Sequence, residues 1–233
     1  MLQLLLKRHG DFTLIFYFSL CLLCLSQNIF AATEIGFVKE LSGTAFAKLP
    51  AEDMRQLNKG DRIYLNDMVT TETKSFIKLQ LKDDSRFELG PDAKLLASKF
   101  IYKQDLEEDS VTVEILKGTF RFVTGLIAKK RPQSMSVETV VATIGIRGTN
   151  VIGEVNATSA TVILLEPEDT SRKSEIVVSN DFGTVTIDKP GYGTEIPDEF
   201  SPPSPPKRMP LQTINNLMRS MQSVQRINLP RPR

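Results

Sequence analysis

Residues 136–155 read SVETVVATIGIRGTNVIGEV, and this stretch contains the strongest fold signal in the chain. It is rich in β-branched residues, which favour strands. Gly145 and Gly148 bracket Ile146 and Arg147, and two glycines inside a strand pattern indicate a bulge, a sharp corner or a close approach of two backbones. Because apolar residues flank Arg147, we expect its guanidinium to pair inside the fold with a carboxylate or with carbonyl groups.

Strand patterns continue on both sides of this stretch. Residues 75–81 (SFIKLQL) alternate apolar and polar side chains, which is the period of a half-buried strand. The polar triplet at residues 83–85 and the Gly-Pro-Asp at residues 90–92 predict turns. The expected strands are 36–48, 61–72, 75–81, 86–89, 111–116, 119–124, 136–146, 150–155, 160–165, 175–178 and 183–187.

The many short strands predict an all-β body over residues 32–200. A sandwich, a barrel and a β-solenoid would all satisfy the pattern. Phrases of the form strand, glycine, strand recur, as in Leu116-Lys117-Gly118-Thr119-Phe120, and they favour stacked coils. We therefore predict a solenoid-like or rolled β-sheet, with a short turn or loop at residues 52–59.

The first 31 residues have the layout of a secretory signal peptide. Lys7 and Arg8 precede an apolar run at residues 12–25, and Ala31 supplies a small residue at the expected cleavage point. The run is shorter than the roughly 20 residues of a membrane-spanning helix, although an uncleaved anchor is the alternative. Cleavage is expected after Ala31 or one residue later.

Removal of that leader also removes every histidine and cysteine. His9, Cys21 and Cys24 are the only such residues in the chain. The mature part then has no thiol nucleophile, no imidazole base and no zinc site built from these side chains, so we predict no catalytic, cofactor-binding or metal-binding residues. A glycan hydrolase that uses two carboxylates is the remaining enzymatic alternative. The adjacent acids at 83–84 and 107–109 fall in predicted turns, where solvated side chains are usual.

The C-terminal part differs in composition from the body. Residues 201–206 read SPPSPP, which cannot join a sheet, and we predict an extended polyproline linker over residues 201–210. Residues 211–233 place apolar side chains three and four apart, which predicts a basic amphipathic helix. The helix is expected to dock on its own body, with contact to a partner or a membrane as the alternative. Residues 32–200 carry an excess of acidic residues, which argues against nucleic-acid binding.

Four phrases, in order along the chain, resemble the FecR domain family. They are Gly60-Asp61-Arg62 with Asp67-Met68-Val69-Thr70-Thr71, the turn Asp84-Ser85-Arg86-Phe87, the strand Leu116-Lys117-Gly118-Thr119-Phe120, and Ala142-Thr143-Ile144-Gly145-Ile146-Arg147-Gly148-Thr149. The resemblance covers about residues 36–195. The residues that carry it, which we expect to be structural, are Gly60, Asp61, Asp67, Thr70, Asp84, Ser85, Gly118, Thr143, Gly145, Arg147, Gly148 and Thr149.

The resemblance implies a periplasmic or secreted all-β protein of a Gram-negative bacterium. FecR-like domains relay signals in the cell envelope, so the implied role is a non-catalytic binding, scaffolding or sensory-relay module. The implied partner is an envelope protein or a cell-wall or surface glycan. Only about ten residues precede the apolar run, too few for a cytoplasmic anti-sigma segment. A sigma-factor partner is therefore not expected, and a membrane-tethered signalling subunit is the alternative if the leader is kept.

Overall fold

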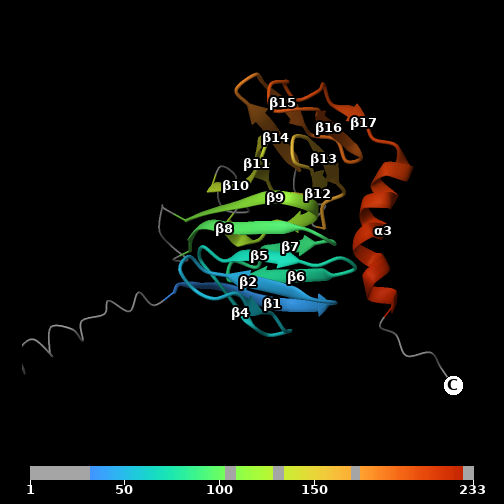
Figure 1. Ribbon diagram of the computed structural model, residues 1–233. Helices are drawn as coiled ribbons and strands as arrows, with labels where there is room; N and C mark the ends of the chain where they lie inside the picture. Colours follow the sequence, from blue (N-terminus) through green and yellow to red (C-terminus); the bar gives the residue numbers. More distant parts are fainter. Residues whose placement is uncertain (1–31, 103–108, 128–133, 169–173, 228–233) are drawn as a thin grey trace, which may run out of the picture. The chain divides into compact units, whose positions relative to one another are not determined.

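The strands of the chain form two sheets that share one long strand (Figure 1). The computed structural model describes residues 32–102, 109–127, 134–168 and 174–227, with side chains up to residue 221. The predicted leader lies outside these residues, as do the acids at 107–108. Within the described residues, no helix has the length and apolar character needed to cross a membrane.

Sheet A is the first of the two. In spatial order it contains β4 (Arg62–Tyr64), β1 (Glu34–Ser42), β6 (Phe76–Leu81), β7 (Arg86–Leu89), β9 (Ser110–Val123), β12 (Asn150–Val155), β13 (Ala160–Leu165), β16 (Tyr192–Ile196) and β17 (Lys207–Arg208). All of its neighbouring strands are antiparallel.

Sheet B is built in the same way. In spatial order it contains β3 (Arg55–Gln56), β2 (Ala45–Lys48), β5 (Met68–Thr71), β8 (Lys94–Ile101), β9, β10 (Met135–Thr139), β11 (Thr143–Arg147), β14 (Glu175–Asn180) and β15 (Gly183–Ile187). β9 and β10 are parallel, and the other neighbours are antiparallel. From β5 onward, the strand order in each sheet follows the chain order. The chain crosses between the two sheets repeatedly, and each new strand is added beside the previous strand of its sheet. The all-β prediction is confirmed, and neither sheet closes on itself within the described residues.

β9 belongs to both sheets because it bends at Gly118. Its first half pairs with β8 and β10 in sheet B, and its second half pairs with β7 and β12 in sheet A. Gly118 has a φ of +97°, and a Cβ at this position would lie 2.5 Å from the Cα of Ala93. Both conditions require glycine. The two strands expected at 111–116 and 119–124 are thus one strand that changes sheets.

The core lies between the inward faces of the two sheets. Every second residue of the central strands points into it, which follows the period-2 rule for strands. The rings of Phe87 and Phe122 stack at 5.5 Å between β7 and β9. Fully buried core residues from both sheets include Ile63, Val69, Leu79, Leu95, Ile115, Phe120, Val137, Ile144, Val151 and Val178.

Several expected elements differ in detail from the observed ones. The strand expected at 136–146 is two strands, β10 and β11, joined by a turn. Gly148, with a φ of +62°, forms the corner from β11 in sheet B to β12 in sheet A. Gly145 shows no close approach, since its nearest neighbour would be 3.7 Å from an added Cβ. β8 and β16 have no counterpart among the expected strands, and the loop expected at 52–59 contains β3.

The proline-rich segment packs on the body and joins a sheet at its end. Ser204 N donates to Glu195 O at 3.0 Å, and Thr194 Oγ1 donates to Ser204 O at 2.7 Å. β17 pairs with β16, and Pro203 is buried. Residues 201–206 contain no strand, as the sequence predicts, whereas Lys207–Arg208, within the segment 201–210 predicted as a linker, form β17.

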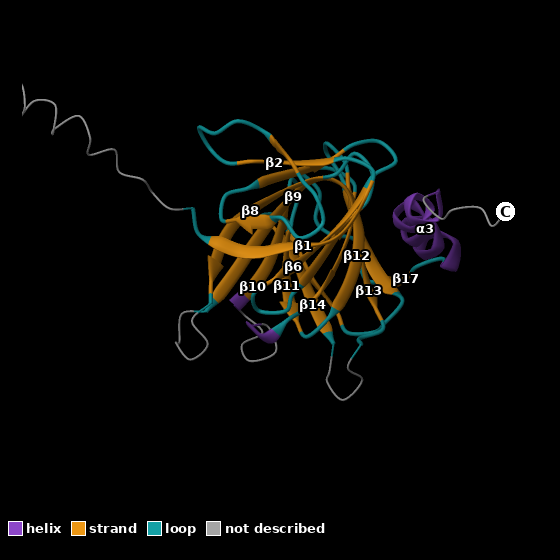
Figure 2. Ribbon diagram, turned by 90° about the horizontal axis from the view of Figure 1, so that it is seen from below, coloured by secondary structure: helices purple, strands orange, loops and turns teal. Residues whose placement is uncertain are grey.

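Helix α3 (Leu211–Ile227) covers part of the outward face of sheet A (Figures 1 and 2). Its apolar side chains, Leu217 and Met221 among them, form a second cluster with Phe76 of β6 and Ile152 of β12. Ile163 of β13 and Met209 complete the buried members of this cluster. The prediction that the helix docks on its own body is confirmed for the described side chains. The apolar face of the helix is used in this contact, while Arg231 and Arg233 lie outside the described residues.

Candidate binding groove

The part of the outward face of sheet A that α3 leaves open is polar. Side chains that point away from the core alternate along each strand, so neighbouring strands place theirs in rows. Phe76 lies at the α3 end of β6, and Lys78 and Gln80 follow on the same face. On β7 the corresponding side chains are Glu88 and Arg86. The helix therefore covers the apolar end of the face and leaves the polar end accessible.

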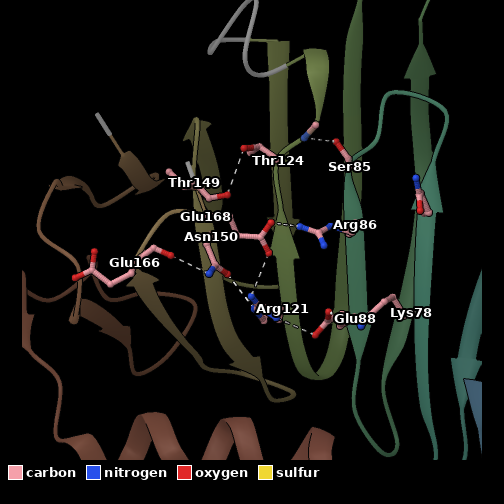
Figure 3. Close-up of polar contacts among 12 residues, drawn as sticks. Lys78, Ser85, Arg86, Glu88, Arg121, Thr124, Thr149, Asn150, Glu166 and Glu168 are labelled. Carbon is pink, nitrogen blue, oxygen red and sulfur yellow. Dashed lines mark hydrogen bonds and ion pairs between the residues drawn. The ribbon is translucent and has the colours of Figure 1, made fainter. Parts of the chain in front are cut away.

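A ladder of ion pairs crosses this polar surface, from β6 to the segment after β13 (Figure 3). Lys78 Nζ lies 3.2 Å from Glu88 Oε1, and Arg121 Nη1 lies 3.4 Å from Glu88 Oε2. Arg121 Nη2 lies 3.8 Å from Glu168 Oε1, while the other oxygen of Glu168 pairs with Arg86. The ladder therefore links three adjacent strands with a carboxylate that is remote in sequence.

The side-chain amide of Asn150 holds Arg121 of the ladder in position. Arg121 Nε donates to Asn150 Oδ1 at 2.9 Å, and Asn150 Nδ2 donates to Glu166 O at 2.9 Å (Figure 3). Side-chain exposure is 20% for Arg121 and 11% for Glu88. Partly buried, hydrogen-bonded charges of this kind are held in one geometry, so the surface is preorganised.

A groove of about 300 Å³ opens beside this ladder. One rim is a chain of polar contacts in which Lys39 Nζ donates to Gln80 Oε1 at 2.7 Å and Gln80 Nε2 donates to Asp84 Oδ1 at 3.0 Å. The Arg86–Glu168 pair forms part of the lining. The groove is lined by Lys39, Gln80, Asp84, Arg86, Val123, Thr124, Gly148, Thr149, Pro167 and Glu168.

One end of the groove is formed where two turns meet the end of β9. Thr149 O accepts hydrogen bonds from Thr124 N at 3.1 Å and from Thr124 Oγ1 at 3.3 Å (Figure 3). Thr149 Oγ1 is buried and has no hydrogen-bond partner among the described residues. A buried hydroxyl without a partner costs free energy.

The turn behind the groove is held by the buried carboxylate of Asp83. Asp83 accepts from Ser85 N at 3.1 Å and from Ser85 Oγ at 2.7 Å, and Ser85 Oγ in turn accepts from Gly125 N at 3.0 Å. Burial raises the pKa of Asp83 above its ordinary value, and the hydrogen bonds from Ser85 oppose that shift. Gly125 is needed because a Cβ there would lie 2.1 Å from Asp83 O. These contacts fix the turn that carries Asp84 and Arg86.

Three of the predicted signature residues line this groove: Asp84 of the β6–β7 turn, and Gly148 and Thr149 of the β11–β12 corner. Ser85 lies behind the groove, where it holds the turn through Asp83 and Gly125. Asp84 adopts a φ of +65°, in the left-handed region that most side chains avoid.

A second group of signature residues lies elsewhere, around turns on either side of β4. Asp61 Oδ2 accepts from Asn58 N at 2.7 Å, and Gly60 has a φ of +93°. Asp67 is buried, accepts from Tyr64 N at 2.7 Å and pairs with Arg55. Burial raises the pKa of Asp67, while the Tyr64 amide and Arg55 oppose the shift.

The remaining signature residues are separate from both groups. Gly118 forms the bend of β9, and Thr70 is a half-buried residue of β5 that faces β2 and β8. Thr143 and Gly145 lie on β11, where Thr143 is exposed. That all of the signature residues have a purely structural role stays a prediction.

Arg147 is not paired inside the fold. Its side chain is 63% exposed, and Nη1 lies 3.9 Å from Glu175 Oε1 of the adjacent strand β14. The expectation of a buried guanidinium is wrong, and the reason is the strand period. Ile144 and Ile146 are the inward residues of β11, so Arg147 points outward from sheet B. Flanking apolar residues therefore did not imply a buried arginine.

Sequence reasoning missed the charged residues of the groove. Lys78, Arg86, Glu88 and Arg121 occupy the polar positions of three strands with alternating patterns, and that shared pattern was the available signal. Glu168 gave no such signal because it lies outside any strand, beyond the end of β13 at Leu165, and meets Arg86 across 82 positions of sequence.

The arrangement suits recognition of a polar group more than bond cleavage. Among the described residues, no cluster of three or more His, Cys, Asp or Glu could hold a metal ion. The two oxygens of Glu168 pair with Arg86 and Arg121, and Asp84 accepts from Gln80. The groove offers charges of both signs in fixed positions. Such a surface can bind a polar peptide segment or a small polar ligand.

Comparison with known proteins bears on the middle of the chain. Residues 67–167 match the family model described as FecR protein, so the resemblance read from the sequence is confirmed over these residues. They include every residue that lines the groove except Lys39 and Glu168. No curated protein matches the chain.

Two solved structures are similar to the chain. Both are crystal structures of a "putative anti-sigma factor" from Parabacteroides distasonis ATCC 8503. One, at 2.50 Å resolution, has 12% identity and a TM-score of 0.49. The other, at 1.65 Å resolution, has 13% identity and a TM-score of 0.47. In each case the similarity covers 65% of this chain and 64% of the other, so the chain spans just under two thirds of their length.

Proposed function

We propose, from the premise that residues 67–167 form a FecR domain, that this protein is a non-catalytic relay module of the cell envelope. It binds an envelope protein through the groove on sheet A. The family match supports the signalling role. The predicted leader supports export, and the absence of His and Cys after residue 24 supports a binding role over a catalytic one.

The observation that carries the proposal is the convergence of two of the four signature phrases on the groove. The β6–β7 turn and the β11–β12 corner are far apart in sequence, yet both line it. A fold that needs turns only for its own stability has no reason to place a preorganised row of charges beside them. Complementary charges on a partner would give specificity and a faster encounter.

A protein partner fits the groove better than a glycan does. Protein interfaces commonly contain arginine and fixed charges of both signs, and Arg86, Arg121, Glu88 and Glu168 provide these here. The apolar members of the lining are Val123 and Pro167, and none of the described lining residues is aromatic. A flat aromatic ring for stacking on a sugar is therefore missing from the described lining.

Photocrosslinking in intact cells tests the proposal. A photoreactive amino acid replaces Gln80 on the groove rim, and the matched control carries it at Thr143, an exposed residue of sheet B. We expect a protein adduct from the Gln80 position that Thr143 does not give. Mass spectrometry identifies the adduct, and a glycan adduct, or equal labelling from both positions, would contradict the proposal.

Export has its own test. N-terminal sequencing of the protein from the envelope fraction is expected to begin at Ala32 or Thr33. A start at Met1 would instead favour the membrane-tethered form.

A further inference from the structure

The edges of the two sheets are protected unequally. β3, β4 and β17 end three of the four edges, and each is two or three residues long and contains Arg or Lys. Short strands and charged residues are the usual means by which proteins keep sheet edges from pairing. β15 ends the fourth edge with five residues, GTVTI, that include no charge and no proline.

The backbone of β15 has unused pairing capacity. Asn180 and Gly183 face each other across a two-residue loop, where Gly183 N donates to Asn180 Oδ1 at 3.1 Å. Thr139 N donates to Ala142 O at the β10–β11 turn, so the residues of β11 that bond to β14 are Thr143, Gly145 and Arg147. Their partners on β14 are Ser179, Val177 and Glu175, which leaves Val178 and Ile176 to bond to Val185 and Ile187 of β15. The hydrogen bonds then alternate, so the N–H and C=O groups of Thr184 and Thr186 point away from β14. Within the described residues, no backbone hydrogen bond is made to these groups.

We propose that β15 pairs with β15 of a second copy, antiparallel and centred on Val185, so that two sheets B join into one. In this register Thr184 lies opposite Thr186 of the other copy, and both pairs exchange their free hydrogen bonds. Val185 forms the non-hydrogen-bonded pair on the two-fold axis, in agreement with its own groups facing β14. A two-fold axis uses the same patch on both copies, which gives a closed dimer.

Charge complementarity supports this occupant of the edge. Beyond the strand, Asp181 lies in the loop before β15 and Lys189 lies in the bend after it, so the antiparallel pair brings Asp181 of one copy to the same end as Lys189 of the other, twice across the axis. Both residues are exposed. Opposite charges on facing positions stabilise a strand pair, whereas like charges destabilise it. The edge is therefore complementary to itself.

Exposed aromatic rings lie beside the same hairpin. Phe182 is 51% exposed and Phe200 is 71% exposed, and their rings meet edge to face at 6.4 Å. A strand pair alone buries little surface, so a stable dimer needs added apolar contact. These rings provide such contact beside β15, which lies at one end of the molecule (Figure 1). This inference concerns assembly and is independent of the groove.

Sedimentation equilibrium of the purified protein tests the dimer, over about 1 μM to about 1 mM, the range of weak to moderate association. We expect a monomer–dimer equilibrium. Thr186→Pro removes an outward donor at a position where an edge strand tolerates proline, and it is expected to raise the dissociation constant about tenfold or more. Thr186→Lys should act in the same direction if the proline variant fails to fold. Thr143→Lys adds the same charge to an exposed threonine of an interior strand and should leave association unchanged.

A charge exchange tests the register. Asp181→Lys should weaken association, because it brings two lysines to the same end of the strand pair. Adding Lys189→Asp to that variant should restore association, since the pairs are then re-formed with their signs reversed. A protein that stays monomeric at the highest concentration, a dimer that Thr186→Pro and Thr186→Lys leave intact, or a double variant that is no better than Asp181→Lys overturns the proposal.

Discussion

The bend of β9 gives a sharp prediction about Gly118. This residue lies where the strand passes from sheet B to sheet A, with a φ of +97°. In Gly118→Ala, the new Cβ would lie 2.5 Å from both the Cα and the Cβ of Ala93, and Ala93 is itself buried. The backbone of either β9 or the segment before β8 must therefore move, which strains the place where the two sheets join.

Two effects add in this variant. A side chain in the left-handed region costs about 1–2 kcal/mol. Forcing an added methyl against packed backbone costs a further ~1–3 kcal/mol. Gly60→Ala separates the two, because Gly60 has a nearly identical φ of +93° and no atom within 4 Å of an added Cβ. Gly118→Ala should thus be less stable than Gly60→Ala by about 1–3 kcal/mol.

Urea unfolding of both variants and the wild type, followed by circular dichroism, measures this difference. The free energy of unfolding should fall modestly in Gly60→Ala and clearly further in Gly118→Ala. Equal losses in the two variants would refute the reasoning, because they would show that the contact with Ala93 carries no energetic weight at the bend.

Three further results are expected. Met221→Ala should destabilise the docking of α3 by roughly 2 kcal/mol, because Met221 is 3% exposed in the cluster on sheet A, and limited proteolysis of the helix would measure it. Gly125→Ala should lower the free energy of unfolding by ~1–3 kcal/mol, since its Cβ would meet Asp83 O. Urea unfolding would show this as a lower midpoint concentration. The raised pKa of Asp83 means that the folded protein binds this proton more tightly than the unfolded chain does. Stability from this residue is then lost as pH rises from the ordinary aspartate range through the folded-state pKa, and Asp83→Asn should remove that part of the slope in unfolding experiments at a series of pH values. If the difference in free energy of unfolding between the wild type and Asp83→Asn does not vary with pH, this assignment of the pH dependence to Asp83 is contradicted.

The sequence predicted those elements whose pattern is local. β7 was expected at residues 86–89 and is observed there, since its alternation lies between two clear turns. The docking of α3 was also expected from its apolar spacing. β8 was missed because Lys94, Ala97 and Lys99 give a composition that is common in helices, and its place between β5 and β9 overrides that preference.

The groove could not be predicted, for a different reason. Its charged row depends on which strands become neighbours, and no local pattern states that β7 lies beside the second half of β9. The bend at Gly118 decides this pairing. From the sequence alone, Gly118 could only be interpreted as a break between two strands. Arg147 shows the same limit, because its neighbours in sequence are buried while its own direction is set by the strand period.

The central claim is that the groove beside Arg86 binds the partner, and one comparison of affinities tests it most directly. Once the crosslinked protein is identified, isothermal titration calorimetry measures its binding to the wild type, to Arg86→Gln and to the matched control Arg147→Gln. Arg86 pairs with Glu168 in the groove, whereas Arg147 points outward from sheet B. We expect Arg86→Gln to weaken binding about tenfold or more, as loss of a partly buried charge at an interface does, and Arg147→Gln to bind like the wild type. Equal affinities for the two variants would contradict the account.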